Sequence, residues 1–211
     1  MNYDNHPMCL KSFEPGSLGR TLPCGATRLS EFTSLSGQFL VSLPTMQGDY
    51  FSHTVMLLIA HNRGGAFGLV INKTLETELA ELLGNQVAQC PPNITVLESG
   101  PVEQNRLFFL HTTEAVFESS VRIADNLALT TSIEILDAIS ENSGPNKILA
   151  GLGYAGWSEG QLENEIQADV WLVIPYTDDI VFNVPFDEQA EAAANSIGVD
   201  LNLISPTPGH G

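Results

Sequence analysis

Short apolar runs constrain the fold of this chain more than any other feature. Most are rich in β-branched or aromatic residues and are bounded by Gly, Pro or Asn, which is typical of strands. The longest run, residues 54–60, is far shorter than the roughly 20 residues that a membrane-spanning helix needs. We expect strands over residues 38–42, 54–60, 66–72, 94–97, 107–111, 147–153, 170–175 and 180–182.

Helical patterns alternate with these runs. Four leucines share one face in residues 75–83, where Thr74 is placed to cap the helix and Gly84 to end it. Thr131 and Glu134 form a capping box for a second helix that ends at residue 144. We expect helices over residues 75–83, 131–144, 161–167 and 187–196.

Composition and element order indicate one folded domain with two loose ends. The 211 residues are 43% hydrophobic, enough for a buried core and against global disorder. Pro and Gly interrupt both ends, so we predict a flexible leader over residues 1–34 and a flexible tail over 205–211. Residues 35–204 are expected to form a single domain. Strands mixed with helices, some adjacent in sequence, predict a mixed α/β or α+β fold.

Net charge limits the partners of this chain. It carries 8 Lys and Arg against 25 Asp and Glu, a formal net charge of −17, and no cation follows Lys147. Nucleic-acid-binding proteins neutralise phosphates with clustered Lys and Arg, and anionic membrane surfaces also attract cations. We therefore expect neither direct nucleic-acid binding nor membrane binding, and we attribute the acidity to solubility.

The N-terminus and the cysteines indicate the compartment. The first residues include Asp4 and contain no apolar run of signal-peptide length. Cys9, Cys24 and Cys90 are scattered, without the spacing of a metal site. These features predict a protein of the reducing cytoplasm, with no metal and no cofactor.

Two familiar motifs overlap after the predicted strand 147–153. The segment Gly151–Gly156 matches G-x-G-x-x-G, whose glycines let a backbone approach a pyrophosphate, but it does not open a helix at its third glycine. The segment Gly156–Gly160 matches the nucleophile elbow G-x-S-x-G around Ser158. The one histidine after that serine is His210, in the predicted tail, so we expect neither nucleotide binding nor hydrolysis here.

Three histidines, His53, His61 and His111, lie at or near predicted strand ends. They lack ligand spacing and thiolate partners, so backbone-bonded structural roles are favoured over metal binding. They could serve a serine nucleophile only in an arrangement unrelated to the α/β-hydrolase order. Neighbouring carboxylates could support acid–base chemistry, although chance adjacency is the simpler interpretation in so acidic a chain: Glu163 with Glu165 and Asp178 with Asp179.

Four ordered blocks of sequence are more specific than either short motif. They are Gly37–Met46, His61–Lys73, Gly100–Val102 with Arg106 and His111, and Gly153–Glu165 followed by Trp171. Together, over about residues 36–200, they resemble the YqgE/AlgH family of bacterial proteins. Ser158 occupies a variable position of the family segment G-Y-A-G-W-x-x-G-Q-L-E, which disfavours a nucleophile there.

The resemblance implies an α+β fold with a bifurcated β-sheet, part of it forming a small barrel, flanked by helices. It also implies that the biochemistry is open, since some members carry a transcription-regulator label tied to alginate production. The candidate functional residues are the polar and aromatic motif residues His61, Asn62, Asn72, Lys73, Arg106, His111, Tyr154, Trp157, Gln161, Glu163 and Glu165. Such residues satisfy backbone groups or contact a partner, so they are either structural caps and turn bonds or the lining of a shared groove.

These observations favour a non-catalytic cytoplasmic protein that binds a small molecule or a protein partner, because no nucleophile–base pair or metal set is evident. Two alternatives stay open. One is a transcriptional regulator that acts through a protein partner, without direct DNA contact. The other is an enzyme of unassigned chemistry.

Overall fold

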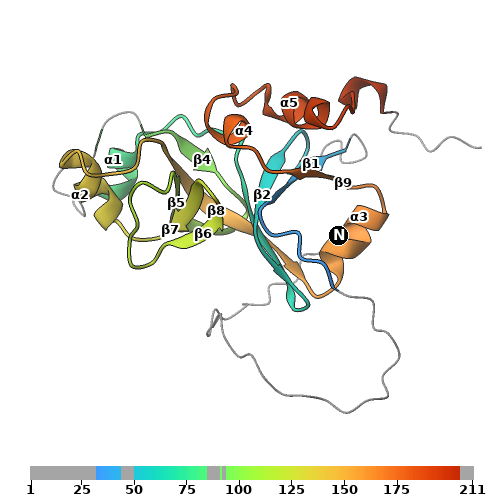
Figure 1. Cartoon of the computed structure of the whole chain (residues 1–211), viewed down its shortest axis with the longest axis horizontal. Coiled ribbons are helices and arrows are strands. Elements are labelled where there is room, and N and C mark those ends of the chain that lie inside the picture. Colours follow the sequence, from blue (N-terminus) through green and yellow to red (C-terminus); the bar gives the residue numbers. More distant parts are fainter. Residues whose placement is uncertain (1–31, 44–49, 85–90, 92–93, 205–211) are drawn as a thin grey trace, which may run out of the picture. The chain divides into compact units, whose positions relative to one another are not determined.

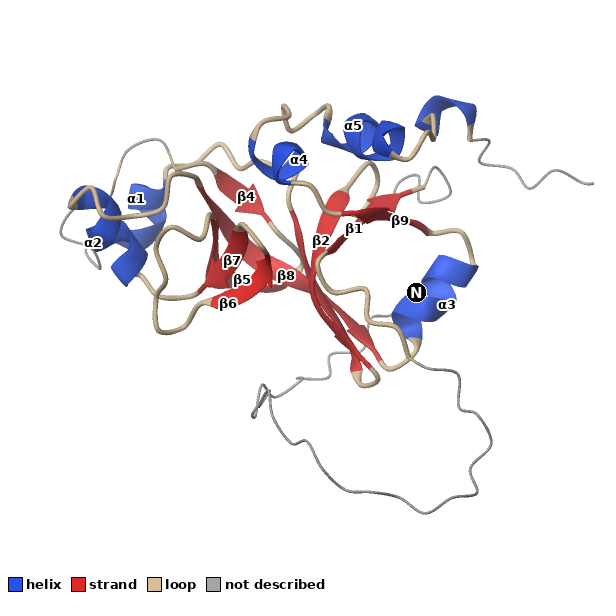
Figure 2. Cartoon of the chain, in the orientation of Figure 1, coloured by secondary structure: helices blue, strands red, loops and turns tan. Residues whose placement is uncertain are grey.

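The structure is a computed structural model, and it describes residues 32–43, 50–84, 91 and 94–204 (Figures 1 and 2). The predicted tail, nearly all of the predicted leader, the three cysteines and His210 lie outside these residues. The strands are β1 (Gln38–Ser42), β2 (Val55–Asn62), β3 (Gly65–Val70), β4 (Val96–Glu98), β5 (Val102–His111), β6 (Val121–Ala124), β7 (Leu127–Thr130), β8 (Ile148–Ser158) and β9 (Trp171–Pro175).

The helices are short. They are α1 (Leu79–Leu83), α2 (Glu134–Ser140), α3 (Gln161–Gln167), α4 (Asp178–Phe182), α5 (Gln189–Ser196) and the 3-10 helix Leu201–Leu203. Within the described residues, none of them has the length and apolar character that crossing a membrane requires.

One nine-stranded sheet contains all of these strands. Its order is β6-β7-β5-β8-β3-β2-β1-β9, and β4 pairs with β8 outside that path. The long strand β8 makes the sheet branch, because its first half pairs with β5 and β4 while its last four residues pair with β3. The branched sheet is partly curled into a half-barrel and flanked by helices (Figure 2), which confirms the predicted α+β fold class.

Gly153 lies where β8 passes from one half of the sheet to the other. Its φ of 72° is in the left-handed region that favours glycine. A Cβ atom at this position would lie 2.2 Å from the carbonyl oxygen of Gly100 and 3.1 Å from that of Val102. The branch therefore depends on a close backbone approach that a side chain would prevent.

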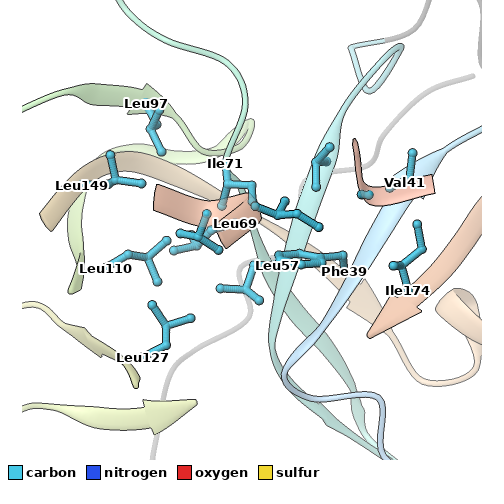
Figure 3. Close-up of a cluster of buried hydrophobic side chains, with 14 of the residues drawn as sticks. Phe39, Val41, Leu57, Leu69, Ile71, Leu97, Leu110, Leu127, Leu149 and Ile174 are labelled. Atoms are coloured by element: carbon cyan, nitrogen blue, oxygen red, sulfur yellow. The ribbon is translucent and has the colours of Figure 1, made fainter. Parts of the chain in front are cut away.

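Three clusters of buried apolar side chains hold the sheet and helices together. The largest lies between the two halves of the sheet and extends to α4 and α5; Figure 3 shows Phe39, Leu57 and Leu69 facing Leu110 and Leu127 across it. The second, which includes Trp157, Leu162 and Trp171, lies under α3. The third packs α1 and α2 against β4, β5 and β8.

Several predicted elements differ from the observed ones. The predicted strand over 180–182 is wrong, because these residues belong to α4, which buries Ile180 and Val181. Thr74 does not cap a helix but forms a bridge with Leu97. The capping box before α2 is also wrong: the helix begins at Glu134, whose N–H donates to the Ser132 hydroxyl.

Candidate functional site

Five of the eleven predicted residues meet where β8 turns into α3. The turn is made by Gly160, whose φ of 72° lets the chain leave the strand and begin the helix. Gln161 and Glu165 are four residues apart on α3 and so share one face, whereas Glu163 points to a different side. We call the hydrogen-bonded set of His61, Trp157, Gln161, Glu163, Glu165 and Trp171 the α3 network.

Glu165 is the centre of the α3 network. Its Oε2 atom accepts hydrogen bonds from the indole N–H groups of Trp157 and Trp171, each at 2.7 Å. Its Oε1 atom accepts a third hydrogen bond from the Gln161 amide at 3.0 Å. Both indoles are buried, so one carboxylate satisfies two donors that would otherwise lose their contact with water. Glu165 therefore ties α3 to β8 and β9.

His61 joins the α3 network from the end of β2. Its Nδ1 atom accepts the Leu35 N–H at 3.0 Å, which leaves Nε2 to donate to Glu163 at 3.1 Å. The His61 side chain is 2% exposed and that of Glu163 is 39% exposed. The pair thus links the helix to the β2 end and presents one carboxylate to solvent.

The groups in and beside the α3 network that could perform chemistry are used in hydrogen bonds within the chain. The Ser158 hydroxyl donates to the Gln161 side-chain oxygen at 3.1 Å, and its own N–H binds the same atom. Both ring nitrogens of His61 are occupied. These hydrogen bonds hold α3 against the sheet and so have a structural role.

Three further predicted residues bind backbone groups of turns and loops near β2 and β3: Asn62, Asn72 and Lys73. Asn62 accepts the Gly64 N–H at 2.7 Å within the β2–β3 turn. Asn72 accepts the Val55 N–H at 2.8 Å and donates to the His53 carbonyl at 2.9 Å. The Lys73 ammonium donates to the Tyr50 carbonyl and lies 4.5 Å from the centroid of the Tyr50 ring.

Arg106 and Tyr154 lie together on neighbouring strands. Arg106 pairs with Glu103 at 3.0 Å, and its guanidinium carbon lies 5.3 Å from the centroid of the Phe108 ring. Tyr154 packs against Phe67 and Phe108, with ring centroids 5.0 and 6.3 Å away. Burial, together with the charge of Glu103, raises the pKa of the Tyr154 phenol.

His111 is fully buried at the far end of β5. Its Nδ1 atom donates to the Thr112 carbonyl at 2.9 Å, and its ring meets the Phe117 ring edge to face. Within the described residues, Nε2 has no hydrogen-bond partner. Burial lowers the pKa of His111, so the ring is held neutral in the folded state.

We expect this buried ring to make stability depend on pH. The unfolded chain takes up a proton near the ordinary value of 6.5, whereas the folded chain resists it, so the free energy of unfolding falls as pH drops below about 6.5. In urea titrations, His111→Gln should lose less stability between about pH 7.5 and 5.5 than the parent protein. Equal slopes in the variant and the parent protein would refute the assignment.

The eleven residues do not all converge. His111 pairs with Ile148, whereas Trp157 lies nine residues further along β8, which is up to roughly 30 Å along the strand at about 3.3 Å per residue. Tyr154 lies in the middle of β8 and Arg106 on the neighbouring β5, and Asn72 and Lys73 follow β3. The structure therefore brings five residues together in the α3 network and leaves the others at separate places, each with partners of its own.

Sequence reasoning missed two contributors to the α3 network. Trp171 follows the last family block but is not among the eleven predicted site residues, although it supplies one of the two indole donors to Glu165. Residues 34–36 hold the backbone and ring of His61 through Ser34, Leu35 and Ser36. No local pattern marks that segment, because its bonds are formed with a residue about 25 positions away.

The basic side chains of the described residues all make contacts within the chain. Arg106 and Lys73 do so as given above, and Arg63 lies 5.7 Å from the centroid of the Phe32 ring. Arg122 donates to the carbonyls of Ala124 and Asp125. Lys147 donates to Asn183. The 21 acidic residues from Glu76 onward consequently leave this part of the surface strongly anionic.

No group of three His, Cys, Asp or Glu side chains suited to a metal ion occurs within residues 32–43, 50–84, 91 and 94–204. The three histidines considered above lie apart: His61 is in the α3 network, His111 is at the end of β5 and His53 is in the loop before β2.

Comparison with known proteins places this chain among relatives of similar length. The chain is 40% identical over 183 residues to a UPF0301 protein of Saccharophagus degradans, covering 85% of this chain and 90% of the relative. It is 40% identical over 181 residues to a UPF0301 protein of Pseudomonas entomophila, covering 83% and 95%. These names state no catalytic activity.

Solved structures share the fold. The solution structure of the AlgH protein from Pseudomonas aeruginosa matches with a TM-score of 0.70 and 38% identity, covering 88% of this chain and all of that one. A Corynebacterium diphtheriae protein matches in fold, with a TM-score of 0.62 at 21% identity over 74% of this chain and 85% of its own. The family model described as AlgH-like matches residues 39–202. This chain therefore belongs to the AlgH-like family, as the resemblance of its sequence blocks predicted.

Proposed function

We propose that this protein is a non-catalytic cytoplasmic binding protein whose ligand is a protein with a basic surface. The proposal rests on the negative charge of the described residues. Their few basic side chains make contacts within the chain, and the acidic residues greatly outnumber them, so the net charge stays strongly negative. A basic partner gains from this surface, because opposite charges speed encounter and favour the correct complex.

The hydrogen bonds in and beside the α3 network support binding over catalysis. The carboxylates and the histidine of the α3 network hold secondary structure together, and Ser158 is bound to Gln161. The anionic surface also repels nucleic acid, so a role in gene regulation enters this proposal only through a protein partner.

Binding of a Lys-rich peptide tests the proposal. We expect a fluorescent peptide with several Lys residues to bind the full chain and to raise its unfolding temperature, with affinity falling at least about tenfold between about 50 and 500 mM salt. Fluorescence anisotropy measures the affinity, and thermal unfolding measures the stabilisation.

The matched ligand controls are a peptide with Glu at each Lys position and a labelled DNA duplex, neither of which should bind. Tight binding of the duplex, or stabilisation by a panel of metabolites but not by the basic peptide, would contradict the proposal. The second result would point to a small-molecule ligand.

A further inference from the structure

Strand β9 is one of the two terminal strands of the main path of the sheet, β6-β7-β5-β8-β3-β2-β1-β9. Its inner edge pairs with β1 over five residues, from Gln38 with Pro175 to Ser42 with Trp171. In the described part of the chain, no strand pairs with its outer edge. Alternate N–H and C=O groups along an edge strand point away from the sheet and form a template for another strand.

The other terminal strand, β6, has features that discourage such pairing. Its register with β7 is broken by a bulge between Arg122 and Ala124, and the exposed Arg122 side chain binds the carbonyls that follow it. Bulges and charged side chains are the usual protection of a sheet edge. The sequence of β9, Trp-Leu-Val-Ile-Pro, contains no charge, its register with β1 is continuous, and only its last residue, Pro175, lacks a backbone N–H to donate.

Both faces of β9 are already covered. Trp171 packs in the cluster under α3, and Ile174 packs in the cluster that includes α4 and α5. Figure 1 shows β9 between α3 and α5. A partner can therefore reach this strand only along its edge, and the strand is held rigid before binding, which lowers the entropy cost of pairing.

The charge of the elements around β9 indicates what kind of segment could pair with its outer edge. Every charged side chain after Lys147 is acidic, including those of α3, α4 and α5. The exposed ones in or close to these elements are Glu159, Asp169, Asp179, Asp187, Glu188, Glu191 and Asp200. A second copy of this chain would bring two anionic surrounds together, whereas a cationic segment would meet complementary charge.

We infer that an extended basic segment of the partner protein adds to the sheet as a further strand along the outer edge of β9. The inference rests on the proposed function and names the site and the mode of binding. Main-chain hydrogen bonds to β9 supply the pairing, and Lys or Arg side chains of the segment meet the exposed acidic residues around the strand, such as Asp169 just before β9 and Glu191 of α5.

A peptide of about seven residues with Lys and Val in alternation is the probe. We expect it to bind the full chain and to slow amide hydrogen exchange in β9 at least about tenfold, with no change in β6. A peptide of the same sequence with N-methyl groups at alternate residues should bind at least about tenfold more weakly, because it cannot donate to the strand.

A pair of protein variants tests the site independently. Val173→Lys places on β9 the kind of charge that protects β6, and it should weaken peptide binding at least about tenfold. Val121→Lys, at a position of β6 that is 57% exposed, is the matched control and should bind normally. The N-methyl comparison uses the unaltered protein, so it is decisive even where Val173→Lys does not fold.

The outcomes separate this inference from the proposed function. Binding with no protection of β9 and no effect of N-methylation would overturn the edge site while leaving a basic ligand in place. Failure of every Lys-containing peptide to bind would overturn both. Concentration-dependent dimerisation that protects β9 without peptide would show a second copy as the occupant and would also overturn the inference.

Discussion

Gly153→Ala is expected to destabilise the fold by about 4 kcal/mol, a large part of the 5–15 kcal/mol of a typical domain. Part of the loss comes from the left-handed φ of 72°, which costs an L-residue about 1–2 kcal/mol. The rest comes from the new methyl group, which would lie 2.2 Å from the Gly100 carbonyl oxygen and would push apart the strands at the branch of the sheet. Urea denaturation of the variant and the parent measures the difference.

Gly160→Ala is the matched control for this prediction. Gly160 has the same φ of 72°, but nothing lies within 4 Å of the position that a Cβ atom would occupy. We therefore expect a loss of only about 1 kcal/mol, due to backbone conformation alone. Equal losses in the two variants would show that the approach of Gly153 to Gly100 does not contribute to stability.

Glu165→Ala is expected to cost about 3 kcal/mol. The change removes the acceptor of both indole N–H groups, which lie on side chains that are only 3–4% exposed, and it also frees the Gln161 amide. Buried donors without an acceptor cost about 1–3 kcal/mol each, and water entering the gap offsets part of that loss. Urea denaturation measures the cost, and tryptophan fluorescence reports the changed environment of the two indoles.

Two further variants refine the Glu165 prediction. Glu165→Gln keeps one acceptor oxygen without the charge and should fall between the parent and Glu165→Ala. Glu163→Ala removes a carboxylate that contacts His61 within the α3 network and is 39% exposed, so a loss of about 1 kcal/mol is expected. A larger cost for Glu163→Ala than for Glu165→Ala would reverse the roles assigned to the two carboxylates.

The local parts of the fold were predictable where the sequence signal was complete. Strand β1 and helix α3 have the predicted bounds, because apolar runs and a helical pattern there end at clear turn residues. Residues 180–182 were misassigned because a run of three apolar residues has no period that separates a strand from one helical turn. Strands β6 and β7 were missed although Asp125 and Asn126 between them are typical residues of a tight hairpin turn.

The sequence predicts most residues of the candidate site but not the hydrogen bonds between them. The family motif identified Trp157, Gln161, Glu163 and Glu165, which lie within nine positions of one another. Their decisive partners, His61 and Trp171, come from other strands, and only the folded sheet shows that the indoles share one carboxylate oxygen. Such long-range contacts leave no periodic trace in a single sequence.

The placement of β1 between β2 and β9 has a consequence for folding during synthesis. The hairpin partner of β1 follows it at once, but its second neighbour leaves the ribosome roughly 130 residues later. At about 5–20 residues per second, the nascent chain carries an unpaired β1 edge for about ten seconds. One edge of the apolar sequence Phe39–Val41 is therefore open to pairing with other chains until β9 has been synthesised.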